Sequence, residues 1–70
     1  MSEINAHITG TVFEVHVAVG DTVAIDDEVV ILESMKMELP VEAEVTGTVA
    51  EVLCAPGDPV ETGQVLIRLA

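Results

Sequence analysis

The chain has 70 residues, which is enough for one domain with a small core and leaves no length for a second. Half of the residues are apolar but only Phe13 is aromatic, and the many β-branched residues favour strands. The net charge of -11, with Lys36 and Arg68 as the only basic side chains, argues against nucleic acid or an anionic membrane as a partner.

Cysteine content and the start of the chain indicate a compartment. Cys54 is the only cysteine, so no disulfide can form within the chain. The first residues carry no basic segment, and no stretch approaches the roughly 20 apolar residues of a membrane span. We therefore expect a cytoplasmic domain that its negative charge keeps soluble and monomeric.

An internal repeat organises the chain. Residues 8–23 and 45–60 are identical at ten of sixteen positions, at a constant offset of 37. Beyond this stretch, residues 28–31 resemble residues 64–67, which predicts one extra residue in the first copy. Neither copy could bury its apolar face alone, so we expect the two to pack around a pseudo-two-fold axis in one closed all-β domain spanning residues 1–70.

In chain order, strands are predicted near residues 4–7, 11–17, 22–24, 28–33, 38–43, 48–54, 59–61 and 65–69. The second of these shows the clearest alternation of apolar and polar residues, and Gly20-Asp21 and Gly57-Asp58 mark turns. Pro40 cannot donate a hydrogen bond to a ladder, so strand 38–43 should lie at an edge or bend there. No window keeps a helical period.

The segment between the copies is predicted to be an exposed hairpin tip. Its sequence is Glu33-Ser34-Met35-Lys36-Met37-Glu38. Two methionines at an exposed turn break the polar pattern of such loops, and local departures of this kind tend to mark functional sites. The only lysine lies between them, so an enzyme that attacks a side-chain amine has one target. The alternative is that the methionines fold back on the core and the lysine is only a solvated charge.

This segment resembles the attachment motif of the biotin/lipoyl-attachment family, whose core is Met-Lys-Met. Gly10 and Gly47 near the start of each copy agree with the family pattern, and the resemblance covers essentially the whole chain. It implies a flattened β-barrel, or sandwich, of two four-stranded halves related by a pseudo-two-fold axis, with the modified lysine on a hairpin tip.

The chain departs from the family in two places. Ser34 stands where members often have alanine, and residues 8–10 stand where many have Met-Pro-Gly. In addition, no insertion between Val12 and Asp21 provides the thumb of the bacterial acetyl-CoA carboxylase carrier. The chain therefore resembles the small, free-standing attachment proteins of bacteria.

The resemblance implies that Lys36 carries biotin. Biotin protein ligase would attach it through biotinyl-adenylate, and the biotin would carry carboxyl groups between a biotin carboxylase and a carboxyltransferase. A solvated lysine amine is almost fully protonated at neutral pH, so the ligase must deprotonate it. We thus expect a substrate and carrier, not an enzyme.

The other residues of the segment are assigned to recognition. Met35 and Met37 are expected to contact the ligase or carboxylase, because methionine suits an adaptable interface. The resemblance suggests that Glu33 helps ligase recognition, and Ser34 and Glu38 complete the motif. The sequence leaves open which substrate of the carboxylase accepts the carboxyl group.

Two other functions stay open. One is a lipoyl carrier with lipoate on Lys36; methionines on both sides favour biotin, because lipoyl domains more often place aspartate before the lysine and alanine after it. Dual modification is also open. The other is an interaction module in which Lys36 stays unmodified.

Other reactive residues give no stronger hypothesis. His7, His16 and Cys54 are too few for a zinc site, and the acidic run at residues 26–28 is better explained as a solvated turn than as a calcium site. Cys54 aligns with Val17 and is expected in the core. The sequence contains no catalytic triad spacing, phosphate loop or nucleotide fingerprint.

Overall fold

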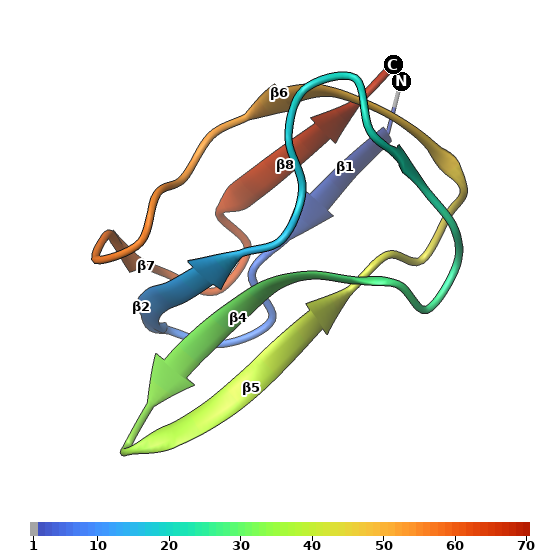
Figure 1. Ribbon diagram of the computed structural model, residues 1–70. Helices are drawn as coiled ribbons and strands as arrows, with labels where there is room; N and C mark the ends of the chain where they lie inside the picture. Colours follow the sequence, from blue (N-terminus) through green and yellow to red (C-terminus); the bar gives the residue numbers. More distant parts are fainter. Residues whose placement is uncertain (1) are drawn as a thin grey trace.

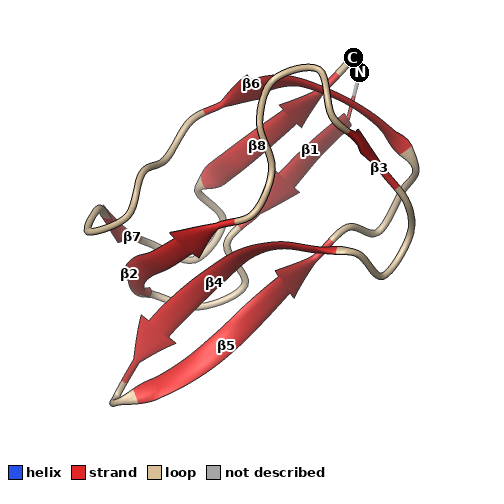
Figure 2. Ribbon diagram, in the orientation of Figure 1, coloured by secondary structure: helices blue, strands red, loops and turns tan. Residues whose placement is uncertain are grey.

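Alternating buried and exposed residues along the chain form eight short strands in the computed structural model, which describes residues 2–70. They are β1 (Ser2–Asn5), β2 (Gly10–Val15), β3 (Thr22–Val23), β4 (Glu28–Ser34), β5 (Met37–Glu42), β6 (Gly47–Val52), β7 (Pro59–Val60) and β8 (Val65–Leu69). Over the described residues there is no helix, as Figure 2 shows, and so none long and apolar enough to cross a membrane. The predicted all-β fold is confirmed.

The strands form two antiparallel four-stranded sheets (Figure 1). One has the order β1-β8-β6-β3 and the other β5-β4-β2-β7. Each sheet therefore takes two strands from the first copy and two from the second. This exchange explains why neither copy can form a core alone.

A pseudo-two-fold axis relates the copies, and equivalent hydrogen bonds demonstrate it. The Val12 amide donates to the Asp58 carbonyl at 2.8 Å, and the Val49 amide donates to the Asp21 carbonyl at 2.8 Å. Both donors and acceptors are separated by 37 residues. The predicted symmetry of the two halves is present in the described chain.

The prediction of an extra residue in the first copy is wrong. Val12 pairs with Leu32, and its counterpart Val49 pairs with Leu69, so the offset remains 37 in the later strands as well. The local likeness of residues 28–31 to 64–67 misled the alignment by one position. Which side chains face inward decides the true register, because a shift of one residue exchanges the faces of a strand.

The core between the sheets is wholly apolar among the described residues. Its members are Ile4, Ala6, Val12, Val23, Val29, Val30, Leu32, Val41, Ala43, Val49, Cys54, Val60, Leu66, Ile67 and Leu69. All except Cys54 form pairs at the offset of 37. The expected core position of Cys54 is confirmed, and its counterpart Val17 packs against the same core.

Small differences from the predicted strand limits have local causes. β2 and β6 end at Val15 and Val52, two residues before the predicted ends, because the chain then leaves the ladder for the turns at Gly20 and Gly57. Pro40 lies in β5, which is an edge strand of its sheet as predicted.

Side chains close the turns. In the turn of residues 18–21, the Asp21 carboxylate accepts a hydrogen bond from the Ala18 amide at 2.9 Å. Asp27 does the same for the Ala24 amide at 2.9 Å. The acidic run at residues 26–28 thus begins in a turn that the Asp27 side chain stabilises.

Candidate functional site, an exposed lysine on a hairpin tip

Residues 33–38 form the end of the β4–β5 hairpin. Ser34 pairs with Met37, and Glu33 pairs with Glu38 in the row behind. Only Met35 and Lys36 remain for the turn, and their φ angles are 52° and 64°. Two positive φ angles in a two-residue loop are those of a type I′ turn, whose twist matches that of the flanking strands.

This turn is built from unfavourable residues. Asparagine and glycine adopt positive φ with little cost, whereas other L-residues pay roughly 1–2 kcal/mol each in this region. Strained backbone of this kind persists where the surrounding structure enforces it, and it clusters at functional positions. The regular ladder of β4 and β5 holds the tip in place here.

The side chains of the tip point into solvent. Met35 is 92% exposed and Met37 is 60% exposed, so the alternative in which both fold back on the core is wrong. Lys36 is exposed as well. Within residues 2–70, the ion pairs involve only His16 or Arg68 as the basic partner, so the Lys36 ammonium is in none of them. Its amine is open to an incoming enzyme.

The tip also protrudes from the molecule. The structure measures 31 × 19 × 18 Å along its principal axes. Figure 1 shows the tip of the β4–β5 hairpin at one end and the C-terminus beside β1 at the other. The lysine therefore stands away from the C-terminus and is accessible from several directions.

Gly10 allows the hairpin to lie close to β2. A Cβ atom at this position would come within 2.5 Å of the Glu33 carbonyl oxygen and 3.4 Å of the Ser34 Cβ atom. These are atoms of the hairpin stem just below the turn. Gly10 is therefore a positioning residue for the tip, and sequence analysis noted it only as part of a family pattern.

Replacing this glycine tests that role. Gly10→Ala is expected to lower the free energy of unfolding by about 1–3 kcal/mol, because overpacking against backbone exceeds the roughly 0.4–1 kcal/mol gained by restricting the unfolded chain. Urea unfolding measures it. In the matched control Gly47→Ala, the new atom meets the Leu69 side chain at 3.2 Å and not a backbone oxygen at 2.5 Å, so the loss should be smaller. Equal losses would contradict the special role of Gly10.

The strain of the turn makes a second prediction. Met35→Asn should raise the free energy of unfolding by about 0.5–1 kcal/mol, because asparagine tolerates positive φ. In a domain of this size, thermal unfolding would then shift upward by several degrees. Met37→Asn is the control; Met37 lies in β5, where asparagine is disfavoured, so no gain is expected. An unchanged or lower melting temperature for Met35→Asn would contradict the turn assignment.

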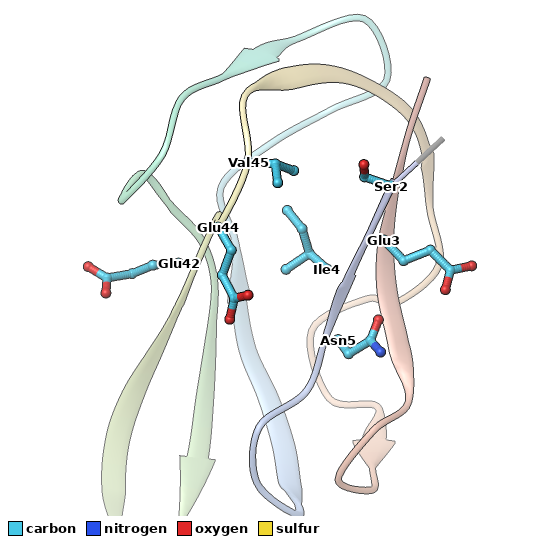
Figure 3. A pocket seen from close by; sticks show the side chains of 7 residues that line it. All are labelled: Ser2, Glu3, Ile4, Asn5, Glu42, Glu44 and Val45. Atoms are coloured by element: carbon cyan, nitrogen blue, oxygen red, sulfur yellow. The ribbon is translucent and has the colours of Figure 1, made fainter.

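One hollow of the surface lies far from the tip. Figure 3 shows it between β1 and the end of β5, where Ile4 and Val45 point toward each other and Glu3 and Glu42 point away. β5 has six residues from Met37 to Glu42, so this hollow lies roughly 17 Å from the tip. It cannot take part in chemistry at Lys36.

The other candidate reactive groups are also remote or inert. Burial raises the pKa of the Cys54 thiol, and the negative charge of Asp58 adds to the effect, so little nucleophilic thiolate forms. Among residues 2–70, no three histidine, cysteine or acidic side chains gather as a metal site requires. The tip is thus the reactive feature of the described chain.

Comparison with known proteins decides the family. The model of the biotin/lipoyl family described as "biotin-requiring enzyme" matches residues 1–69. The chain belongs to the biotin/lipoyl-attachment family. The biotin/lipoyl attachment protein of Bacillus subtilis is 43% identical over 67 residues, which are 96% of this chain and 92% of that protein.

Two further relatives show the range of the family. The biotinylated protein TB7.3 of Mycobacterium tuberculosis (strain H37Rv) is 51% identical over 41 residues, 59% of this chain and 58% of that protein. The crystal structure of Kluyveromyces lactis urea carboxylase superposes with a TM-score of 0.91 at 35% identity. The match covers 99% of this chain but only 6% of the carboxylase.

These findings confirm the predicted family, its flattened sandwich and its class of function. The chain is a carrier domain of this family and not a catalyst.

Proposed function

We propose that Lys36 carries biotin through an amide at its Nζ atom. Biotin protein ligase attaches the group, and the biotinyl arm then carries carboxyl groups between a biotin carboxylase and a carboxyltransferase. The observation that carries this proposal is the position of the lysine. It is the only lysine of the chain, and it is exposed in a two-residue turn at the end of a rigid hairpin.

The shape of the tip suits a carrier arm. The ladder of β4 and β5 fixes the Cα atom of Lys36, while the lysine side chain and an attached biotin add flexible bonds beyond it. A fixed base with a mobile arm lets one group visit two active sites at a high effective concentration. The exposed methionines beside the lysine offer adaptable apolar contacts to the enzymes that receive the arm.

The attachment chemistry divides between domain and ligase. The neutral amine of Lys36 attacks the acyl carbon of biotinyl-adenylate; the amide C–N bond forms, the bond to the adenylate oxygen breaks, and AMP leaves. The amine must lose its protons on the way. Within residues 2–70, no hydrogen bond or ion pair holds the Lys36 amine, so we assign the base to the ligase.

Biotin is favoured over lipoate by the residues that flank the lysine. Methionine stands on both sides, and the mycobacterial relative is named as a biotinylated protein. The lipoyl carrier remains the second candidate, because the name of the Bacillus subtilis relative includes both groups. Both candidates use the same lysine.

A pair of parallel reactions tests the proposal. The purified chain is incubated with biotin, ATP and biotin protein ligase, or with lipoate, ATP and lipoate protein ligase, and its intact mass is followed in time. We expect one biotinyl group per chain, slower lipoylation or none, and no labelling of K36R. Lipoylation alone, or labelling of K36R at the normal rate, would overturn the proposal.

A further inference from the structure

The two sheets differ in the charge of the side chains at the centre of their outer faces. In the sheet β1-β8-β6-β3, Arg68 stands between Glu3 and Glu51 on the neighbouring strands. Its guanidinium donates to the Glu51 carboxylate at 2.8 Å and approaches the Glu3 carboxylate at 3.5 Å. Three charged side chains therefore cover the centre of this face, and the arginine compensates part of the negative charge of the two glutamates.

The sheet that carries the lysine has apolar side chains at two of these three places, and Glu14 stands at the third, where the other sheet has Glu51. We call β1-β8-β6-β3 the twin sheet. At the offset of 37, Ile31 stands where the twin sheet has Arg68, and Pro40 stands where it has Glu3. Phe13 is the extra residue of a β-bulge opposite Ile31, where the bulge of the twin sheet has Ala50. Phe13 is 42% exposed. We call Phe13, Ile31 and Pro40 the Ile31 patch.

Acidic residues surround the Ile31 patch. Their positions on β2, β4 and β5 are Glu14, Glu28, Glu33, Glu38 and Glu42. Two pairs of them, Glu33 with Glu38 and Glu28 with Glu42, stand directly opposite each other across the hairpin, where like charges repel. The strands of this sheet contain no basic residue; His16, just after β2, lies 2.7 Å from Glu14, and Lys36 is in the turn beyond β4. A partner with arginine or lysine around an apolar centre would relieve the repulsion.

We propose that the Ile31 patch is the surface on which biotin protein ligase docks, through an apolar side chain surrounded by basic ones. This inference rests on the proposed function. Ile31 and Pro40 lie on the hairpin itself, about 10 Å along β4 from its end at the turn, and Phe13 lies on the neighbouring β2. A standard interface covers about 800 Å² of each partner, so an enzyme that encloses the Lys36 amine on this side also covers the patch.

The short length of the unmodified lysine side chain favours the ligase, over the carboxylase subunits, as the protein that binds the Ile31 patch. The ligase acts on the bare amine, which extends only one lysine side chain from the backbone, so it must approach the hairpin closely. The carboxylase sites receive the far end of a biotinyl arm and can remain further from the sheet. The surface that decides acylation is therefore the one next to the tip.

The twin sheet supplies the variants for a test. The double variant I31R/P40E gives this face the side chains that the other sheet carries beside its own glutamate, and F13A gives it the alanine of the twin bulge. The control E3Q/R68M removes the ion pairs of the opposite sheet. Each protein is biotinylated by the ligase with biotin and ATP, its kcat and KM are measured separately, and its folding is checked by thermal unfolding.

We expect I31R/P40E to lower kcat/KM of the ligase at least about tenfold, mainly through KM, because charge replaces the apolar centre of the interface. F13A should lower it in the same sense, which keeps the test valid if the double variant does not fold. The control should keep the wild-type rate. Added salt should slow acylation of the wild type, because screening weakens its attraction to a basic partner.

Two negative results are distinguishable. Wild-type protein that stays unlabelled would overturn the proposed function and this inference with it. Labelled wild type together with unchanged rates for I31R/P40E and F13A would overturn this inference alone. If those variants, once biotinylated, instead became poor substrates of a biotin carboxylase with ATP and bicarbonate, the face would belong to that subunit and the proposal would be wrong.

Discussion

Exchanging the two residues of the turn, as M35K/K36M, is expected to lower acylation by about 100-fold or more. The variant has the same composition and charge as the wild type, and its lysine is still exposed. However, the rigid type I′ turn directs the side chains of its first and second residues differently, since Met35 and Lys36 occupy distinct positions of it. A displacement of about 1 Å at a reacting centre can cost 10²-fold in rate.

The measurement is the initial rate of biotin transfer by the ligase, with the fold monitored by circular dichroism. Met37→Leu serves as the control, because it changes an apolar side chain of the tip while the lysine keeps its place. Labelling of M35K/K36M at a rate near that of wild type would show that the ligase recognises an accessible amine and not its position.

Leu32→Ala is expected to cause the largest loss of stability. Leu32 is completely buried in β4 between Val12 and Leu39 on the neighbouring strands. Removing such a side chain costs about 2–5 kcal/mol, through lost burial and the cavity that remains. A domain of this length has only about 4–10 kcal/mol of stability in total, so the variant should be unfolded in part at 37 °C.

Urea unfolding gives the loss directly, and biotinylation gives its consequence. Since β4 leads to the turn, labelling of Lys36 should fall as the folded fraction falls. The control Val19→Ala truncates a residue that is 67% exposed, and its stability should stay within about 0.5 kcal/mol of wild type. Full labelling of an unfolded Leu32→Ala protein would show that the fold is not required for recognition.

Much of the fold is predictable from the sequence because its signals are local. Alternation of apolar and polar residues located all eight strands within a few residues, and Gly20 and Gly57 marked turns that have positive φ. The edge position of Pro40 followed from its missing amide hydrogen. Each of these inferences needs only neighbouring residues.

Pairing between distant strands is not predictable in the same way. β3 joins β6 and β7 joins β2, so each sheet mixes the two copies, and no local pattern encodes that choice. The constant offset of 37 could have been found by matching inward-facing positions: Val30 with Ile67, and Leu32 with Leu69. Similarity of residue type alone suggested the wrong register.

In the candidate site, too, the local features are predictable from the sequence and the contacts between strands are not. The hairpin tip and the exposure of Lys36 follow from the repeat and from the departure of Met35 and Met37 from turn chemistry. The contact of Gly10 with the Glu33 carbonyl oxygen depends on the approach of two strands. The Ile31 patch depends on cross-strand register and on a bulge, and neither is visible in the sequence.

Peptide mapping by mass spectrometry of the protein purified from cells with an active ligase tests the central claim most directly. We expect a single biotinyl group, on the Nζ atom of Lys36, and no such group at the N-terminus. Protein whose Lys36 is always bare in such cells, or whose biotin lies at another position, would contradict it.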